Sequence, residues 1–193
     1  MDLDPLAEAR RWYEEALMAE VPEANAMALA TADLEGRPCV RYLLFKSFDE
    51  RGLSFHTNYA SRKGRELDAN PHAAVAIFWQ PLGRQVRMEG RVERATPEES
   101  DAYFATRPRE RRIGAWASRQ GSVLPSREAL EERVRELSEQ FGDGDIPRPD
   151  WWGGYLLRPD VIELWERGEE RLHDRAHFGR RADGSWEALL LAP

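Results

Sequence analysis

The sequence contains a single cysteine, Cys39, among 193 residues, and only two of its 28 basic residues are lysines, Lys46 and Lys63. One cysteine excludes an internal disulfide and any metal site built from several thiolates. No apolar run approaches the roughly 20 residues that a membrane-spanning helix requires. The acidic first residues precede no apolar segment, so we predict no secretory signal, a cytoplasmic location and no membrane partner.

Basic residues are also fewer than acidic residues. Asp and Glu number 35 against 28 Lys and Arg, which gives a net charge of −7. Such a balance disfavours attraction of the whole surface to nucleic acid, so we expect no nucleic-acid partner. A nucleic-acid-binding barrel stays open as an alternative that steep salt dependence of binding would revive. Any anion site must be a local basic pocket. Dinucleotide-binding, P-loop, zinc-protease and nucleophile-elbow motifs are absent as well.

Hydrophobic periodicity predicts a mainly β protein with peripheral helices, an α+β fold. Helices are expected after the capping residues Asp4, Ser61, Thr96 and Ser126. Strands are expected at 27–32, 40–48, 53–57, 73–79, 85–94, 155–157, 161–166, 172–178 and 186–191. With these strands, three or four helices and no βαβ rhythm, the pattern favours an antiparallel barrel. We expect one domain over 1–193.

Two cations, Arg41 and Lys46, interrupt the apolar strand 40–48. Positions five apart on a strand face opposite sides unless a bulge intervenes. An anionic ligand would relieve the cost of burying such charges, whereas an edge strand would leave them solvated. Both interpretations stay open for this segment.

The segment from Thr57 to Lys63 ends a strand, turns, and starts a helix with Arg62 and Lys63 in its first turn. Cations there oppose the helix dipole, unless an anion also binds the free N–H groups. We therefore favour a phosphate site at this helix over two solvated charges.

Three further clusters are weaker signals. Gln85 and Arg87 share one face of an alternating strand. Tyr103 and Arg107 lie four residues apart at the end of a helix, so they share a face that suits a phosphate. Arg171, His173 and Arg175 are expected to alternate onto one strand face. A lone histidine beside arginines lacks partner ligands, so we predict no metal site.

In this order, the motifs resemble those of the pyridoxamine 5′-phosphate oxidase family. The matching stretches are Arg41–Lys46, Thr57-Asn58, Ser61–Lys63, Arg84–Val86, Tyr103-Phe104, Arg107-Pro108, Ile113–Trp116, Trp152–Gly154, Arg171–Arg175 and Leu191–Pro193. The resemblance implies an FMN-binding split β-barrel that dimerises with FMN at the subunit interface. It also implies oxidation of pyridoxamine or pyridoxine 5′-phosphate to pyridoxal 5′-phosphate by O₂, with H₂O₂ as a product and ammonia released from the amine.

The same resemblance implies roles for particular residues. Arg171 and His173 would be catalytic and would lie against the substrate ring. The substrate would also contact Lys46, Tyr103, Arg107 and Arg111. FMN would contact Arg41, Lys46, His56, Thr57, Arg62, Lys63, Gln85, Gln120, Trp165 and Arg175, some of them from the partner subunit.

The chain departs from the family pattern at four residues. His56 stands where a tyrosine is usual, Arg111 and Gly121 where serines are usual, and Leu190 where an arginine is usual. We also expect the chain to lack the longer N-terminal arm of some members. A same-fold FMN oxidase of the phenazine-biosynthesis type and a non-catalytic flavin or pyridoxal-phosphate module are the alternatives.

Overall fold

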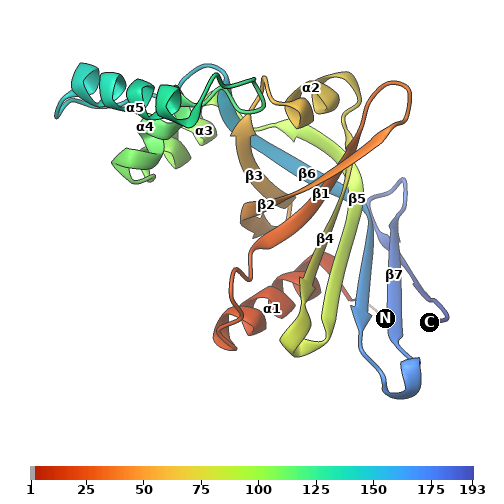
Figure 1. The fold of residues 1–193 in the computed structure, drawn as a ribbon. Coiled ribbons are helices and arrows are strands. Elements are labelled where there is room, and N and C mark those ends of the chain that lie inside the picture. Colours follow the sequence, from red (N-terminus) through yellow and green to blue (C-terminus); the bar gives the residue numbers. More distant parts are fainter. Residues whose placement is uncertain (1–2) are drawn as a thin grey trace.

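Eight strands form one antiparallel sheet in the computed structural model, which describes residues 3–193. The strands are β1 (Ala26–Ala32), β2 (Pro38–Asp49), β3 (Gly52–Asn58), β4 (His72–Trp79), β5 (Arg84–Arg94), β6 (Trp152–Glu166), β7 (Asp174–Arg180) and β8 (Trp186–Leu190). Their order is β3-β2-β1-β4-β5-β6-β7-β8, and β3 also pairs with β6. Six strands therefore close into a barrel, and β7 and β8 extend from it as a flap (Figure 1). The expected antiparallel split barrel is confirmed. Met1 and Asp2, part of the acidic N-terminus, lie outside the described residues.

Five α-helices surround the barrel: α1 (Pro5–Met18), α2 (Arg62–Ala69), α3 (Pro97–Ala105), α4 (Arg109–Ala117) and α5 (Arg127–Phe141). The short helices η1 (Gln80–Leu82) and η2 (Glu169–Arg171) complete the list. All four predicted caps are confirmed: Asp4, Ser61, Thr96 and Ser126 each accept a backbone N–H at the start of a helix. The prediction of three or four helices was wrong, because the structure has five α-helices. Helix α4 was missed, since no side chain caps its first residue.

The barrel interior is filled by alternate residues of its strands. Val86, Met88 and Val92 of β5 point inward, as predicted, against Leu157 and Ile162 of β6. A second, smaller cluster joins α3, α4 and α5 to the start of β6, with Phe104, Ile113, Leu137, Ile146 and Trp152 buried. Each such side chain contributes about 1.5–3 kcal/mol on burial. The helices α3 and α4 are therefore fixed to one end of the barrel.

The two strands expected at 155–157 and 161–166 form one continuous strand, β6. A proline usually interrupts a strand, because it cannot donate a ladder hydrogen bond. Here Pro159 lies opposite Gly90, at a shift of register between β5 and β6. A Cβ on Gly90 would lie 2.1 Å from the Arg158 carbonyl oxygen, so only glycine lets the strands approach at this bulge.

Candidate active site

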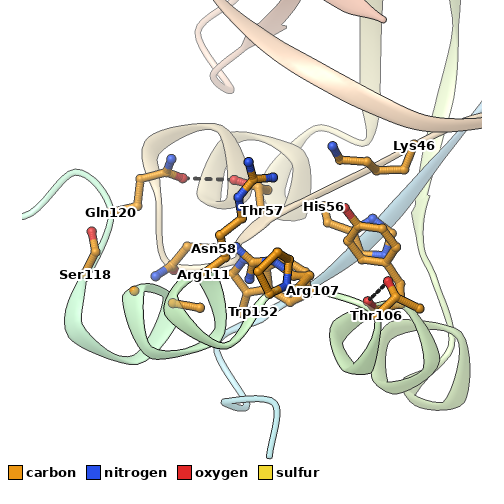
Figure 2. A pocket seen from close by; sticks show the side chains of 14 residues that line it. Lys46, His56, Thr57, Asn58, Thr106, Arg107, Arg111, Ser118, Gln120 and Trp152 are labelled. Atoms are coloured by element: carbon orange, nitrogen blue, oxygen red, sulfur yellow. Dashed lines mark hydrogen bonds between the residues drawn. The ribbon is translucent and has the colours of Figure 1, made fainter. Parts of the chain in front are cut away.

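A cavity of about 570 Å³ opens between strands β2, β3 and β6 and helices α3 and α4 (Figure 2). Seven of its lining residues were predicted from the sequence: Lys46, His56, Thr57, Tyr103, Arg107, Arg111 and Gln120. Sequence reasoning assigned no role to others that line it, among them Asn58, Thr106, Ser118 and Trp152. Trp152 opens the Trp-Gly-Gly motif and could have been found from that signal. The lining holds three cationic side chains and no carboxylate.

An aromatic stack forms one wall of the cavity. The His56 ring lies 3.9 Å from the Tyr103 ring and 5.3 Å from the Trp152 ring, centroid to centroid. The Arg107 guanidinium lies over Trp152, 4.6 Å from its centroid. Burial, together with the positive charges of Lys46 and Arg107, lowers the pKa of His56 to about 4, so the ring is neutral at pH 7. His56 Nδ1 and Arg107 Nη1 are buried and have no hydrogen-bond partner among the described residues.

Lys63, at the start of α2, is buried with only 8% of its surface exposed. Its ammonium donates to Gln120 Oε1 at 2.8 Å, Thr57 Oγ1 at 3.1 Å and Ser61 Oγ at 3.3 Å. All three acceptors are neutral. Burial and the charge of Arg41 therefore lower the pKa of Lys63 to about 8. A buried cation with only neutral partners is a costly arrangement that an anion would relieve.

Gln120 belongs to the segment between α4 and α5, and it also accepts a hydrogen bond from Thr57 at 2.9 Å (Figure 2). The next residue, Gly121, has φ = +88°. Glycine adopts that backbone conformation without strain, unlike serine. The departure at Gly121 thus has a backbone explanation in this chain.

Arg41 and Arg62 meet at a carboxylate that sequence reasoning missed. Glu66 accepts from Arg41 Nη2 at 3.1 Å and from Arg62 Nε at 2.7 Å, and it also contacts the Thr31 hydroxyl. Burial opposes its ionisation, but these hydrogen bonds outweigh burial and lower the pKa of Glu66. The i,i+4 spacing of Arg62 and Glu66 was a usable signal for their pair. Arg41 faces this network while Lys46 lies exposed, so the two cations of β2 do not form one cluster.

The remaining predicted residues lie at the other end of β6. Gln85 of β5 pairs in register with Trp165, whose ring lies 4.6 Å from the His173 ring. Arg175 forms an ion pair with Glu163 at 3.0 Å. The backbone N–H of Gly168 donates to His173 Nδ1 at 3.2 Å. This bond makes Nδ1 an acceptor, which leaves Nε2 as the ring nitrogen that can donate.

The expectation that Arg171, His173 and Arg175 alternate on one strand was wrong. Strand β7 begins only at Asp174, and Arg171 ends the turn η2. Glu170 and Arg171 have φ values of +49° and +66°, a left-handed conformation that is strained for residues other than glycine. Arg171 is therefore placed by a tight turn, and its side chain is exposed.

The predicted residues thus form two groups. Trp152 lies with the cavity at one end of β6, and Trp165 lies with His173 at the other. At about 3.3 Å per residue, the strand covers roughly 40 Å between these tryptophans. Figure 1 shows α3 and α4 at one end of the barrel and the turn from β6 to β7 at the opposite end.

Residues 3–193 contain no group of three or more His, Cys, Asp or Glu side chains arranged to hold a metal ion. None of their helices is long and apolar enough to cross a membrane.

Comparison with known proteins agrees with these observations. Residues 13–141 match the family model described as pyridoxamine 5′-phosphate oxidase. Residues 152–193 match the model described as the pyridoxine 5′-phosphate oxidase C-terminal dimerisation region. The chain is 52% identical to pyridoxine/pyridoxamine 5′-phosphate oxidase 1 of Ralstonia nicotianae, an alignment that covers 100% of this chain and 91% of the relative.

Solved structures show the same fold. PhzG from Burkholderia lata, in complex with tetrahydrophenazine-1-carboxylic acid, is 34% identical with a TM-score of 0.94, covering 98% of this chain and 93% of that one. A pyridoxamine 5′-phosphate oxidase-related, FMN binding protein from Nostoc punctiforme has a TM-score of 0.78, covering 99% of this chain and 98% of that one. At 21% identity, the second likeness concerns the fold alone.

Proposed function

Because this chain belongs to the pyridoxamine 5′-phosphate oxidase family, we propose that it converts pyridoxamine and pyridoxine 5′-phosphates to pyridoxal 5′-phosphate with FMN as cofactor. O₂ is the final electron acceptor, and H₂O₂ is released. The enzyme class follows from 52% identity across the whole chain to an oxidase of this activity. Among the structural observations, the buried Lys63 without an anionic partner supports the cofactor proposal most directly.

The residues around Lys63 fit the phosphate of FMN. The ammonium, the Thr57 and Ser61 hydroxyls and the N-terminus of α2 together offer several donors to one anion. Arg41 and Arg62 would add positive charge from the Glu66 network beside them. The side-chain oxygen of Gln120 now accepts hydrogen bonds from Thr57 and Lys63. A bound phosphate would compete with it for these two donors. FMN, when bound, supplies the acceptor for a hydride equivalent from the substrate C4′ carbon.

The carboxylate-free cavity would hold the substrate phosphate. Lys46 reaches it from β2, while Tyr103 and Arg107 reach it from α3 and the turn that follows. Arg107 Nη1, which is buried and has no hydrogen-bond partner among the described residues, would donate to that phosphate. His56 contributes a neutral, stacked ring, which keeps this wall flat and its charge low. These residues would hold the substrate by its phosphate and leave its ring free to be oriented by others.

Arg171 and His173 would orient that ring. Because Gly168 occupies His173 Nδ1, the Nε2–H is the donor available to a substrate oxygen or nitrogen. Trp165 supports the His173 ring from the side. Arg171 adds a guanidinium whose position is set by the strained turn η2. Their role is to position the ring, because the redox step belongs to the cofactor.

A homodimer would bring the two groups of residues together. One protomer holds them at opposite ends of β6, so a second copy is needed to place Arg171 and His173 over the cavity. The match of 152–193 to a dimerisation region supports this arrangement. An exposed apolar stripe on β2, Val40, Tyr42 and Leu44, supports it too, since Tyr42 is 81% exposed in the single chain.

A second candidate is an oxidase acting on a phenazine-type substrate, which the 0.94 TM-score with PhzG favours. Its identity of 34% is lower than the 52% shared with the Ralstonia oxidase. A phenazine carboxylate also lacks the phosphate that the cationic cavity suits. We therefore rank it second.

The deciding experiment is an anaerobic mix of the FMN-loaded protein with pyridoxamine 5′-phosphate, followed through the oxidised flavin band. We expect rapid bleaching, return of the colour in air, and formation of pyridoxal 5′-phosphate. Bound flavin that does not bleach with this substrate, but bleaches with a dihydrophenazine carboxylate, would overturn the assignment in favour of the second candidate. Bleaching with neither would indicate a binding module.

A further inference from the structure

Glu66 of α2 is a buried carboxylate that takes no part in the proposed redox chemistry. Only 6% of its surface is exposed, and its two oxygens accept hydrogen bonds from three side chains. Arg62 Nε donates at 2.7 Å, Arg41 Nη2 donates at 3.1 Å, and the Thr31 hydroxyl donates as well. Arg41 is fixed further by Nη1, which donates to the Thr31 hydroxyl at 2.6 Å and to the Leu29 carbonyl at 3.2 Å. The carboxylate thus joins two arginines from separate elements.

The carboxylate also lies close to Lys63. The two residues are three positions apart on α2, so they share a face of the helix, and both are buried. Burial lowers the pKa of Lys63 to about 8, and the nearby charge of Glu66 acts against that shift. Arg41, Arg62 and Lys63, the cation cluster, therefore gather around a single carboxylate.

Glu66 affects the ligand-free and the anion-bound protein differently. Before an anion binds, its charge offsets the repulsion among the three cations. Each arginine has given Glu66 only one of its five N–H donors, so both keep donors for a second anion. An anion that uses the cation cluster comes within reach of the Glu66 charge. Like charges repel strongly in a poorly solvated site, so the carboxylate opposes this second anion.

We propose that Glu66 is an internal counter-ion that stabilises the cation cluster before FMN binds and thereby limits the affinity for FMN. The proposal rests on the proposed function, because it takes the FMN phosphate as the second anion. Loss of the Glu66 charge costs the ligand-free protein its counter-ion. In the FMN-bound protein the phosphate supplies negative charge to the same cations, so the loss costs less. By linkage, removing the charge of Glu66 tightens FMN binding.

The test compares the full-length protein with Glu66→Gln, which keeps the shape of the side chain and removes its charge. Asp68→Asn is the matched control, because Asp68 is the other carboxylate of α2 and pairs with Arg94 at the surface. Three probes are used: FMN, riboflavin, which is the same flavin without phosphate, and inorganic phosphate. Flavin fluorescence gives the dissociation constants, and thermal unfolding gives the stability with and without each probe.

For Glu66→Gln we expect FMN to bind about tenfold more tightly, the scale of one partly screened charge pair, with little change for riboflavin. The ligand-free variant should unfold roughly 5 °C below the wild type, because three cations lose their counter-ion. FMN and inorganic phosphate should each raise its unfolding temperature by more than they raise that of the wild type. Asp68→Asn should match the wild type in FMN affinity.

A double variant decides the question if Glu66→Gln does not fold. Arg62→Gln combined with Glu66→Gln removes one charge of each sign, so the network keeps its charge balance. The double variant should bind FMN more tightly than Arg62→Gln alone, by a similar factor.

Unchanged or weaker FMN binding on loss of the Glu66 charge would overturn the proposal, and Glu66 would then serve the fold or orient the arginines. Equal tightening of FMN and riboflavin would overturn it too, since riboflavin carries no phosphate. Failure of the proposed function is distinguishable. A wild-type protein that binds FMN but never oxidises pyridoxamine 5′-phosphate would contradict the enzyme assignment alone. Normal turnover with an FMN affinity indifferent to Glu66 would contradict this inference alone.

Discussion

The two ends of strand β6 are built in opposite ways. At the first end, functional side chains are buried and anchored: Lys63 has three hydrogen-bond acceptors, and Trp152 is part of a packed cluster. At the second end, Arg171 projects from a strained turn, and the half-buried His173 lies directly before the β7–β8 flap. A site buried inside one chain can be completed during folding, whereas residues on a flap are free to complete a site on another molecule.

This contrast separates two tasks. The anchored end is suited to hold ligands, since three hydrogen bonds already fix the ammonium of Lys63. The exposed end is suited to orient a ring that is already held. Substitutions at the anchored end should therefore lower ligand affinity, whereas substitutions at the exposed end should lower turnover.

The largest effect is expected from Arg171→Ala. Loss of the guanidinium should lower kcat/KM for pyridoxamine 5′-phosphate by about a hundredfold or more, because a mispositioned ring reacts slowly. FMN should be retained at nearly wild-type affinity, measured by flavin fluorescence on dilution. Glu170→Ala is the control, since it alters the same turn without touching the guanidinium. If Arg171→Ala lowered FMN affinity as much as it lowered kcat/KM, the proposed difference between the two ends would be contradicted.

Lys63→Gln should show the opposite pattern. We expect FMN affinity to fall about tenfold to a hundredfold, the range for a hydrogen bond to a charged group in a buried site. Arg65→Gln on the same helix is the control, because Arg65 is exposed and contacts only a backbone carbonyl. Equal FMN affinity in Lys63→Gln and wild type would contradict the phosphate site at α2.

The low pKa of Lys63, about 8, gives this site a pH dependence with a definite sign. Above that pH the free amine predominates in the ligand-free protein, so FMN affinity should fall by up to tenfold per pH unit. The stability of the ligand-free protein should change in the opposite direction. The unfolded chain binds more protons than the folded one between pH 8 and the ordinary lysine pKa of 10.5, so stability rises across that window. Both slopes should disappear in Lys63→Gln.

Mixing the Lys63→Gln and Arg171→Ala variants tests the comparison directly. If one protomer supplies the anchored half and its partner the exposed half, a mixed dimer of Lys63→Gln and Arg171→Ala contains one intact site. When an equal mixture is unfolded and refolded, half of the dimers are mixed, and each mixed dimer has one intact site of two. At saturating substrate, and at an FMN concentration that fills wild-type sites but not Lys63→Gln sites, activity should return to about one quarter of the wild-type value. Activity no greater than the sum of the two variants would place both halves of the site in the same chain.

Most of the fold could be predicted because its signals are local. Alternation revealed strands such as β5, and the side-chain caps Asp4, Ser61, Thr96 and Ser126 revealed four helices. Helix α4 was missed because Pro108 at its start makes no capping bond. Strand β6 was divided in two because the compensation for Pro159 lies on another strand, at Gly90.

The site was predictable in composition but not in arrangement. Motif residues gave the seven predicted members of the cavity wall, yet nothing local showed that Glu66 joins Arg41 to Arg62 across two elements. The turn at Glu170 and Arg171 has a positive φ at residues that rarely adopt it, so periodicity extended β7 too far. Tertiary contacts and backbone strain decided these points, and a single sequence shows neither.

The continuity of β6 through Pro159 has a genetic consequence. In the proposed dimer this one strand contributes Trp152 to the site of its own subunit and Trp165 to that of its partner. A single codon change at the bulge, such as one replacing Gly90, would disturb the strand between them. Such an allele would impair both active sites of a dimer. In a cell that also makes the normal chain, mixed dimers would lose activity as well, so the defect would be partly dominant.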